Sequence, residues 1–224
     1  MSSRSYRSPL REEQARQTQR RILDAAYGLL LEQGYTATTM AAVASAAGVS
    51  TQTVYKTFGT KPALVKRLYD VTLVGDDEPI PFGDRPETLA LRAETDPRRL
   101  LAGYARLGRG LAERLGPLLR VLVGGARAGD PELREFVDTI NGERLVGSTQ
   151  MVDHLAELGA LRPGLSRERA RDAIWMLNSV EVWSLLTEQR GWSGDEYADW
   201  VGTAMADAVL PPGGMSGADG GRSD

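Results

Sequence analysis

The chain has 224 residues, a net charge of −3, an apolar fraction of 42% and no cysteine. This length allows one or two domains with a core of their own. The absence of cysteine excludes disulfides, thiolate catalysis and cysteine-ligated metal sites. No apolar run approaches the roughly 20 residues that span a bilayer, and the first 14 residues lack the apolar centre of a secretory signal. We therefore expect a cytoplasmic protein without a membrane partner.

Charge is divided unevenly along the chain. Residues 1–70 contain ten basic and five acidic residues, a net charge of +5, whereas the remaining residues contain 17 basic and 25 acidic ones, a net charge of −8. A basic segment joined to an acidic one is typical of a nucleic-acid-binding end attached to another module.

The first elements are an arm and a long helix. Residues 1–10 are rich in Ser and Arg and predict a disordered arm. Its Arg4 and Arg7 either reach toward DNA or belong to a solvated tail, and both interpretations stay open. A helix is expected from about Arg11 to Gln33, with apolar residues at helical spacing, and Gly34 should end it.

The stretch that follows predicts three short helices joined by tight turns. It reads GYTATTMAAVASAAGVSTQTVYKTFGTKPALVKRLY, from residue 34 to residue 69. Thr38 or Thr39 should cap the first helix, and Gly48 should end it. Ser50 and Thr60 should cap the next two, which begin near residues 51 and 61. Two short helices with a glycine-containing turn between them form a helix-turn-helix.

The helix over residues 51–58 has an unusual exposed face. It offers uncharged hydrogen-bonding groups, one aromatic ring and one lysine but no carboxylate, whereas an ordinary solvated face mixes Glu with Lys. Such a face suits a polyanion, and the alternative is a small capped helix facing water. Gln52 and Thr53 are candidates for base edges, and Tyr55, Lys56 and Lys61 for phosphates. The residues expected to face DNA are Thr39, Ser50, Thr51, Gln52, Thr53, Tyr55, Lys56 and Lys61.

Residues 15–70 resemble the N-terminal domain of TetR-type transcription regulators. The resemblance is carried by Gly34-Tyr35, Thr38-Thr39-Met40, Ala46-Ala47-Gly48-Val49-Ser50, Thr53-Val54-Tyr55, Phe58 and Lys61. Gln52 departs from it, because many members have Gly there. The resemblance implies an all-α fold, with a three-helix helix-turn-helix domain followed by a larger helical domain for ligand binding and dimerisation.

The rest of the chain predicts further helices. Residues 75–85 should form a hinge loop before a short helix over 86–93. Longer helices are expected over 97–115, 118–128 after a break at Gly116-Pro117, 131–158, 167–190 and 194–209, the last with a capping box from Ser193 and Glu196. The expected domains are 11–74 for DNA binding and 75–210 for effector binding and dimerisation, and residues 211–224 predict a disordered tail.

The two apolar C-terminal helices favour a homodimer. In the resembled family the last two long helices pack against their copies, and a two-fold dimer reads two half-sites. Family members commonly bind a small molecule in the second domain, although apolar stripes are also plain core. The candidate effector contacts are Tyr104, Phe136, Asn141, Met151, His154, Trp175, Met176, Asn178 and Trp183.

No motif indicates an enzyme, a cofactor or a metal site. The sequence therefore predicts a homodimeric regulator that binds double-stranded DNA, most simply a repressor released by a small, largely apolar effector. An activator or an architectural factor without ligand control remains the alternative.

Overall fold

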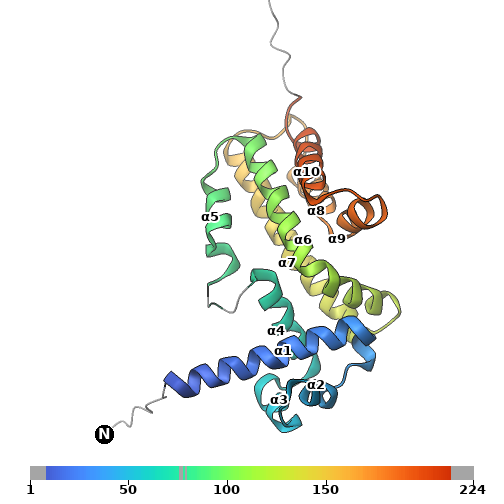
Figure 1. The fold of residues 1–224 in the computed structure, drawn as a ribbon. Coiled ribbons are helices and arrows are strands. Elements are labelled where there is room, and N and C mark those ends of the chain that lie inside the picture. Colours follow the sequence, from blue (N-terminus) through green and yellow to red (C-terminus); the bar gives the residue numbers. More distant parts are fainter. Residues whose placement is uncertain (1–8, 76–77, 79, 213–224) are drawn as a thin grey trace, which may run out of the picture. The chain divides into compact units, whose positions relative to one another are not determined.

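The computed structural model describes residues 9–75, 78 and 80–212, with side chains from residue 11 onward (Figure 1). All regular elements of this described part are helical. They are α1 (Pro9–Ala37), α2 (Met40–Ala47), α3 (Thr51–Phe58), α4 (Lys61–Val74), η1 (Phe82–Asp84), α5 (Pro86–Ala93), α6 (Pro97–Arg127), α7 (Pro131–Glu157), α8 (Arg167–Leu177), α9 (Val180–Trp183), η2 (Ser184–Gln189) and α10 (Gly194–Val209).

These helices belong to two compact units. Unit 1 consists of residues 1–79 and 111–141, and unit 2 consists of residues 80–110 and 142–224. The second half of α6 and the first half of α7 thus group with the first 79 residues, whereas the sequence suggested a single boundary near residue 75. Most of the expected arm and tail lies outside the described residues, although residues 9 and 10 already belong to α1.

The core of unit 1 starts partway along α1. Ile22 is the first fully buried side chain, and Ala26 and Leu30 follow it on the same stripe. Gly34 has the non-helical angles φ 79° and ψ 176°, so the long first helix ends there as predicted, and a short helical segment follows it as far as Ala37. Only a glycine adopts this conformation without strain.

The predicted break at Gly116-Pro117 is wrong, because α6 runs continuously from Pro97 to Arg127 with Pro117 inside it. Proline removes one backbone donor from a helix. Here Leu115 and Leu118 on either side of it are both buried. Burying a leucine side chain is worth about 1.5–3 kcal/mol, so packing on both sides of the proline offsets the local loss.

The predicted single helix over 167–190 is also wrong. In unit 2, α8 ends at Leu177, Asn178 has φ −92° and ψ 39°, and Ser179 caps the short α9. The chain then passes through a π-helical segment, η2. Arg144 Nη2 donates to the carbonyl oxygens of Trp175, at 2.9 Å, and Asn178, at 3.2 Å, so a side chain from α7 satisfies the carbonyls that the break exposes.

Three predicted helix starts in the second half of the chain are confirmed. The Asp130 carboxylate accepts from the backbone N–H of Leu133, at 3.1 Å, and the Ser166 hydroxyl caps α8. Ser193 and Glu196 form the expected capping box of α10. Hydrogen bonding from the Ser193 backbone and hydroxyl lowers the pKa of the Glu196 carboxyl.

Candidate nucleic-acid interface

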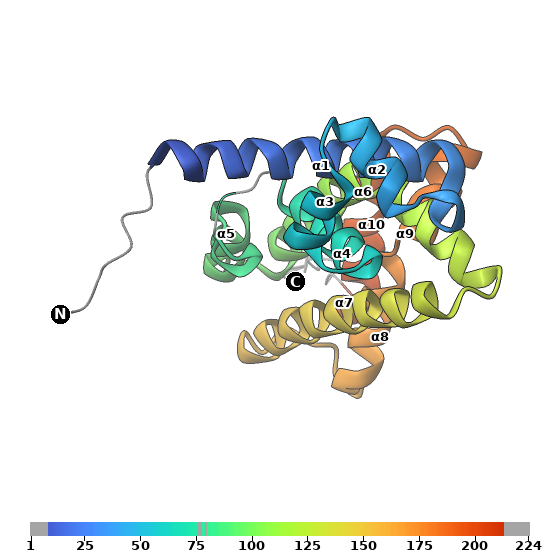
Figure 2. The ribbon, with the colours of Figure 1, turned by 90° about the horizontal axis from the view of Figure 1, so that it is seen from below.

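Side-chain caps fix the helix-turn-helix of unit 1. Thr39 caps α2 by accepting from Ala42 N, and Gly48 ends that helix in the left-handed region, at φ 66°. Ser50 caps α3 by accepting from Thr53 N, and Thr60 caps α4 by accepting from Ala63 N. In Figure 2, α2 lies against α1, and α3 lies next to α2.

The outer face of α3 presents three long side chains together. Val54 is fully buried and anchors the helix from inside. Gln52, Tyr55 and Lys56 follow the i, i+3, i+4 spacing of one helix face, and all three are exposed, Tyr55 at 52%. No residue of α3 is acidic. This face therefore offers an amide, a phenol and an ammonium group without a repelling carboxylate on the same helix.

Among the residues predicted to contact DNA, most of those with short hydroxyl side chains already take part in hydrogen bonds within the helix-turn-helix. Ser50 Oγ and Thr53 Oγ1 are 2.8 Å apart, and Thr53 is half-buried. Thr39 Oγ1 is occupied as the cap of α2. Thr51 is exposed at the first position of α3. These hydroxyls can still accept or donate a second hydrogen bond. The long side chains that extend from α3 into solvent are those of Gln52 and Lys56.

Lys61 has a different environment from the other predicted DNA contacts. Its ammonium donates to the carbonyl oxygen of Tyr35, at 2.5 Å, and lies 3.8 Å from the centre of the Tyr35 ring. Burial lowers the pKa of Lys61, while the nearby carboxylates of Glu132 and Asp130 act to raise it. Its phosphate contact stays a prediction, and it would have to compete with the Tyr35 carbonyl.

Tyr35, which accepts from Lys61, also contacts the first turn of α7. Its phenol donates to Glu132 Oε2, at 2.7 Å, across 97 residues of sequence. Burial, followed by that hydrogen bond, raises the pKa of the Tyr35 phenol. The ring of Phe136, one turn further along α7, meets Tyr69 of α4 edge to face, with the ring centres 5.8 Å apart. No local pattern indicates such contacts, so sequence reasoning missed Glu132.

The nine predicted effector contacts are divided between the two units. Phe136 and Asn141 belong to unit 1, and the other seven belong to unit 2. Within unit 2, Met176 is 50% exposed and therefore does not line the interior. His154 Nε2 lies 2.9 Å from the carbonyl oxygen of Glu94, so this ring takes part in a contact within unit 2.

The remaining candidates pack around α6, α8 and α9. Met151 and Trp183 are buried, and the Trp183 ring meets Tyr197 edge to face, with the ring centres 4.9 Å apart. Tyr104 is half-buried. A Cβ built on the buried Gly108 would lie 1.8 Å from Oδ1 of Asn178, so Asn178 fills the space that this glycine leaves.

Arg144, at the centre of this group, is not among the predicted effector contacts. The Arg144 guanidinium lies 5.0 Å from the centre of the Trp175 ring. The indole Nε1 of Trp175 is buried and has no hydrogen-bond partner among the described residues. An aromatic residue on a helix gives no sign in the sequence that an arginine from another helix will stack on it.

Two classes of site find no support in the described part of the chain. No group of three or more His, Cys, Asp or Glu side chains in residues 9–75 and 80–212 is placed to hold a metal ion. None of the helices described is both long and apolar enough to cross a membrane.

Known proteins match both the helix-turn-helix and the fold. Residues 22–68 match the family of bacterial regulatory proteins of the tetR type. The uncharacterised HTH-type transcriptional regulator YdeS of Bacillus subtilis is 27% identical over 159 residues, which cover 70% of this chain and 74% of YdeS.

Two solved structures share the fold. NalD of Pseudomonas aeruginosa, the secondary repressor of the MexAB-OprM multidrug efflux pump, has a TM-score of 0.67 at 23% identity, over 90% of this chain and 100% of NalD. The regulator FadR of Bacillus subtilis, solved in complex with stearoyl-CoA, has a TM-score of 0.67 at 19% identity, over 85% of this chain and 98% of FadR. Together with the capped helix-turn-helix and the carboxylate-free face of α3, these matches show that residues 22–68 form a DNA-binding domain of the tetR type, followed by helices that share the fold of known regulators.

Proposed function

We propose that this regulator is a repressor that binds a palindromic operator as a homodimer and is released by a small, largely apolar effector. The exposed face formed by Gln52, Tyr55 and Lys56 carries the DNA-binding part of the proposal. Gln pairs best with adenine in the major groove, and Tyr and Lys suit phosphate oxygens. Because α3 has only eight residues, it covers few base pairs alone.

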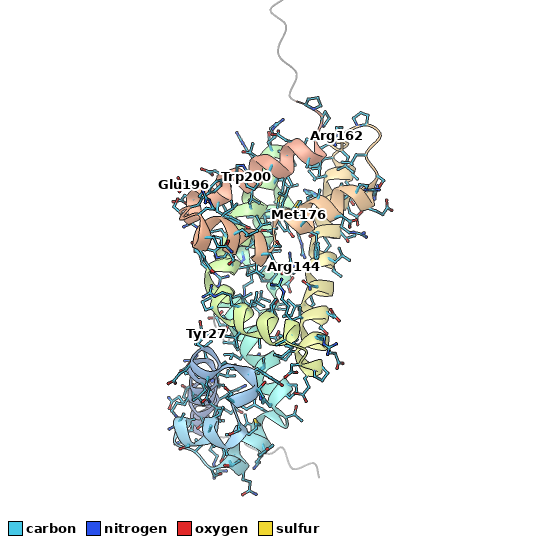
Figure 3. All side chains as sticks on the ribbon, turned by 90° about the vertical axis from the view of Figure 1, so that its right-hand side faces the viewer. Tyr27, Arg144, Arg162, Met176, Glu196 and Trp200 are labelled. Carbon is cyan, nitrogen blue, oxygen red and sulfur yellow. The ribbon has the colours of Figure 1, made fainter. Side chains whose placement is uncertain are left out.

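A second copy would supply the second half-site. Met176 on α8 and Trp200 on α10 are 50% and 45% exposed, although both are large and apolar (Figure 3). The two helices pack against each other within unit 2, and Trp200 also meets Trp192 edge to face, with ring centres 5.8 Å apart. Exposed apolar groups on two adjacent helices support a protein interface, and a two-fold partner is the occupant that operator reading requires.

Effector control is supported by the fold and by the composition of unit 2. FadR, which shares this fold, was solved with stearoyl-CoA, and NalD is a repressor. In this chain, unit 2 holds Met151, Trp183 and Tyr197 as large buried side chains. Such apolar, aromatic surroundings suit a largely apolar ligand.

The DNA-binding part is tested by replacing Gln52 with Ala. Gln52 is exposed and lies on α3, so we expect the fold to be unaffected, while binding to the operator weakens by about 1–3 kcal/mol and one position of the half-site relaxes. Gln33→Ala removes the same exposed amide from α1 and should leave operator binding unchanged. Equal losses on operator and random duplexes would remove Gln52 from the base contacts.

The repressor part is tested by gene deletion. A reporter placed behind the operator should rise in expression when the gene is deleted and fall again when it is restored. A fall on deletion would indicate an activator, and no change would indicate an architectural role. Either result would contradict the proposal.

A further inference from the structure

The part of the chain that contains the helix-turn-helix has few cations. The basic side chains of residues 22–70 are Lys56, Lys61, Lys66 and Arg67. Lys56 is exposed, Lys66 Nζ lies 2.7 Å from Asp70 Oδ1, and Arg67 is half-buried. The number of phosphates that Lys and Arg neutralise sets both the affinity for duplex DNA and its salt dependence. Withholding a single lysine from the DNA would therefore change both quantities measurably.

Tyr35 holds the ammonium of Lys61 through two contacts. Its carbonyl oxygen accepts from Lys61 Nζ, at 2.5 Å, and Nζ lies 3.8 Å from the centre of its ring. A cation over an aromatic ring is attracted by the negative charge of the ring face, most strongly where water is excluded. Lys61 is half-buried, so water weakens these contacts less than it would weaken contacts of an exposed lysine.

The carboxylate of Glu132 contacts the hydroxyl of the same tyrosine. The Tyr35 phenol donates to Glu132 Oε2, at 2.7 Å, while the Lys61 ammonium lies over the ring face. Hydrogen bonds that share a group polarise one another, so donation to a carboxylate makes the ring more attractive to the cation above it. Burial, the largest effect, lowers the pKa of Lys61, and the negative charges of Glu132 and Asp130 act against it by favouring the ammonium form.

The two carboxylates at the start of α7 have different roles in the fold. Asp130 Oδ1 accepts from the backbone N–H of Leu133, at 3.1 Å, and so caps α7. Glu132 is exposed, and its carboxylate accepts from the Tyr35 phenol. The charge of Glu132 can therefore be removed without disturbing the start of α7.

We propose that Glu132 is a positioning residue for DNA binding, whose carboxylate acts through Tyr35 to retain the Lys61 ammonium and so withholds one cation per protomer from the DNA backbone. A phosphate and this carboxylate compete for the same ammonium, because both are anions. Lys61, one of the residues that carry the family resemblance, then contributes less to backbone binding than an exposed lysine does. This inference rests on the proposed function only in that unit 1 binds DNA.

The test is the salt dependence of binding to a duplex of about 30 base pairs and arbitrary sequence, measured by fluorescence anisotropy between about 50 and 200 mM NaCl. Glu132→Gln removes the charge but keeps the side-chain size and an oxygen that accepts from the Tyr35 phenol. Each protomer should gain about one phosphate contact, so the slope of log K against log salt should become steeper by about 0.9. Over this salt range, affinity would then fall about 3.5-fold more than in the unchanged protein.

Glu135→Gln is the matched control, because Glu135 is an exposed carboxylate about one turn further along α7. It removes the same charge from the same helix and should leave the slope unchanged. Equal slopes for Glu132→Gln and Glu135→Gln would overturn the proposal.

A double-mutant cycle with Lys61→Ala separates release of the lysine from a general loss of negative charge. Alone, Lys61→Ala should lower the slope by less than about 0.9, whereas in the Glu132→Gln background it should lower the slope by about 0.9. If Glu132→Gln has the same effect with and without Lys61, the carboxylate repels DNA directly and the proposal is wrong. A purely structural contact would change the amide hydrogen exchange of unit 1 but not the slope, and this result would also overturn it.

Failure of this inference is distinguishable from failure of the proposed function. If Glu132 does not act on Lys61 but α3 reads an operator, Gln52→Ala still costs operator affinity while Glu132→Gln and Glu135→Gln behave alike. If α3 reads no operator, the slope on an arbitrary duplex still becomes steeper in Glu132→Gln.

Discussion

Replacing Tyr35 with Phe removes the phenolic hydroxyl that hydrogen-bonds the end of α1 to Glu132 in the first turn of α7. The change keeps the buried ring, its contact with Lys61 and the backbone carbonyl that accepts from Lys61. A hydrogen bond to a charged group is worth about 1.5–3 kcal/mol. Because Glu132 is exposed to water, we expect less than this range, about 1 kcal/mol lost from the stability of unit 1.

The assay must report on unit 1. All four tryptophans of the chain belong to unit 2, so intrinsic tryptophan fluorescence reports the unfolding of unit 2 and not that of unit 1. Amide hydrogen exchange of peptides from α2 and α4 measures the opening free energy directly. In a double-mutant cycle, Tyr35→Phe and Glu132→Ala should show a coupling of about 1 kcal/mol.

Glu135→Ala provides the control for this cycle, because Glu135 is an exposed carboxylate one turn along the same helix. It should show no coupling with Tyr35→Phe. The pH dependence has a definite sign. Since the pKa of Tyr35 is raised in the folded protein, its stabilisation is complete below the unfolded tyrosine value of about 10 and is lost as the pH rises above it. Additive effects of the two substitutions at neutral pH would refute the reasoning.

Three further predictions follow from the geometry. Gly108→Ala places a Cβ 1.8 Å from Asn178 Oδ1 and should cost about 1–3 kcal/mol in urea unfolding followed by tryptophan fluorescence, whereas Gly142→Ala, in the same unit and with nothing within 4 Å of its Cβ, should cost nothing. The double variant Met176→Asp/Trp200→Asp should give the mass of a monomer in light scattering. The control Leu89→Asp, at an equally exposed apolar site on α5, should remain a dimer. A dimer mass for both variants would contradict the proposed interface. Lys56→Ala should lower the salt slope by about 0.9, and Lys61→Ala by less, because the Lys61 ammonium donates to Tyr35; the reverse order would show that Lys61 leaves Tyr35 for a phosphate.

Local features of the fold could be predicted from the sequence. Thr39, Ser50, Thr60 and Ser193 each cap a helix where the sequence places a cap. A cap depends on a side chain and a backbone N–H two or three residues away, so neighbouring residues decide it. The bounds of the helix-turn-helix were predictable for the same reason.

Features that depend on distant residues could not be predicted. The break after α8 is held by Arg144 from α7 and by the space above Gly108 on α6, and neither is visible in the apolar pattern of residues 167–190. The continuity of α6 through Pro117 reflects burial on both of its sides. In the candidate site, the exposure of Gln52 and Lys56 follows from helix periodicity, whereas the capture of Lys61 by Tyr35 required the fold.

Selection of binding sites from a random duplex pool tests the central claim most directly, because it asks what the outer face of α3 reads and how many copies read it. We predict that the unchanged protein enriches an inverted repeat, with half-site centres one helical turn or a multiple of it apart. Gln52→Ala should enrich the same repeat with one position degenerate in each half. A single unrepeated site, or an identical motif from both proteins, would contradict the account.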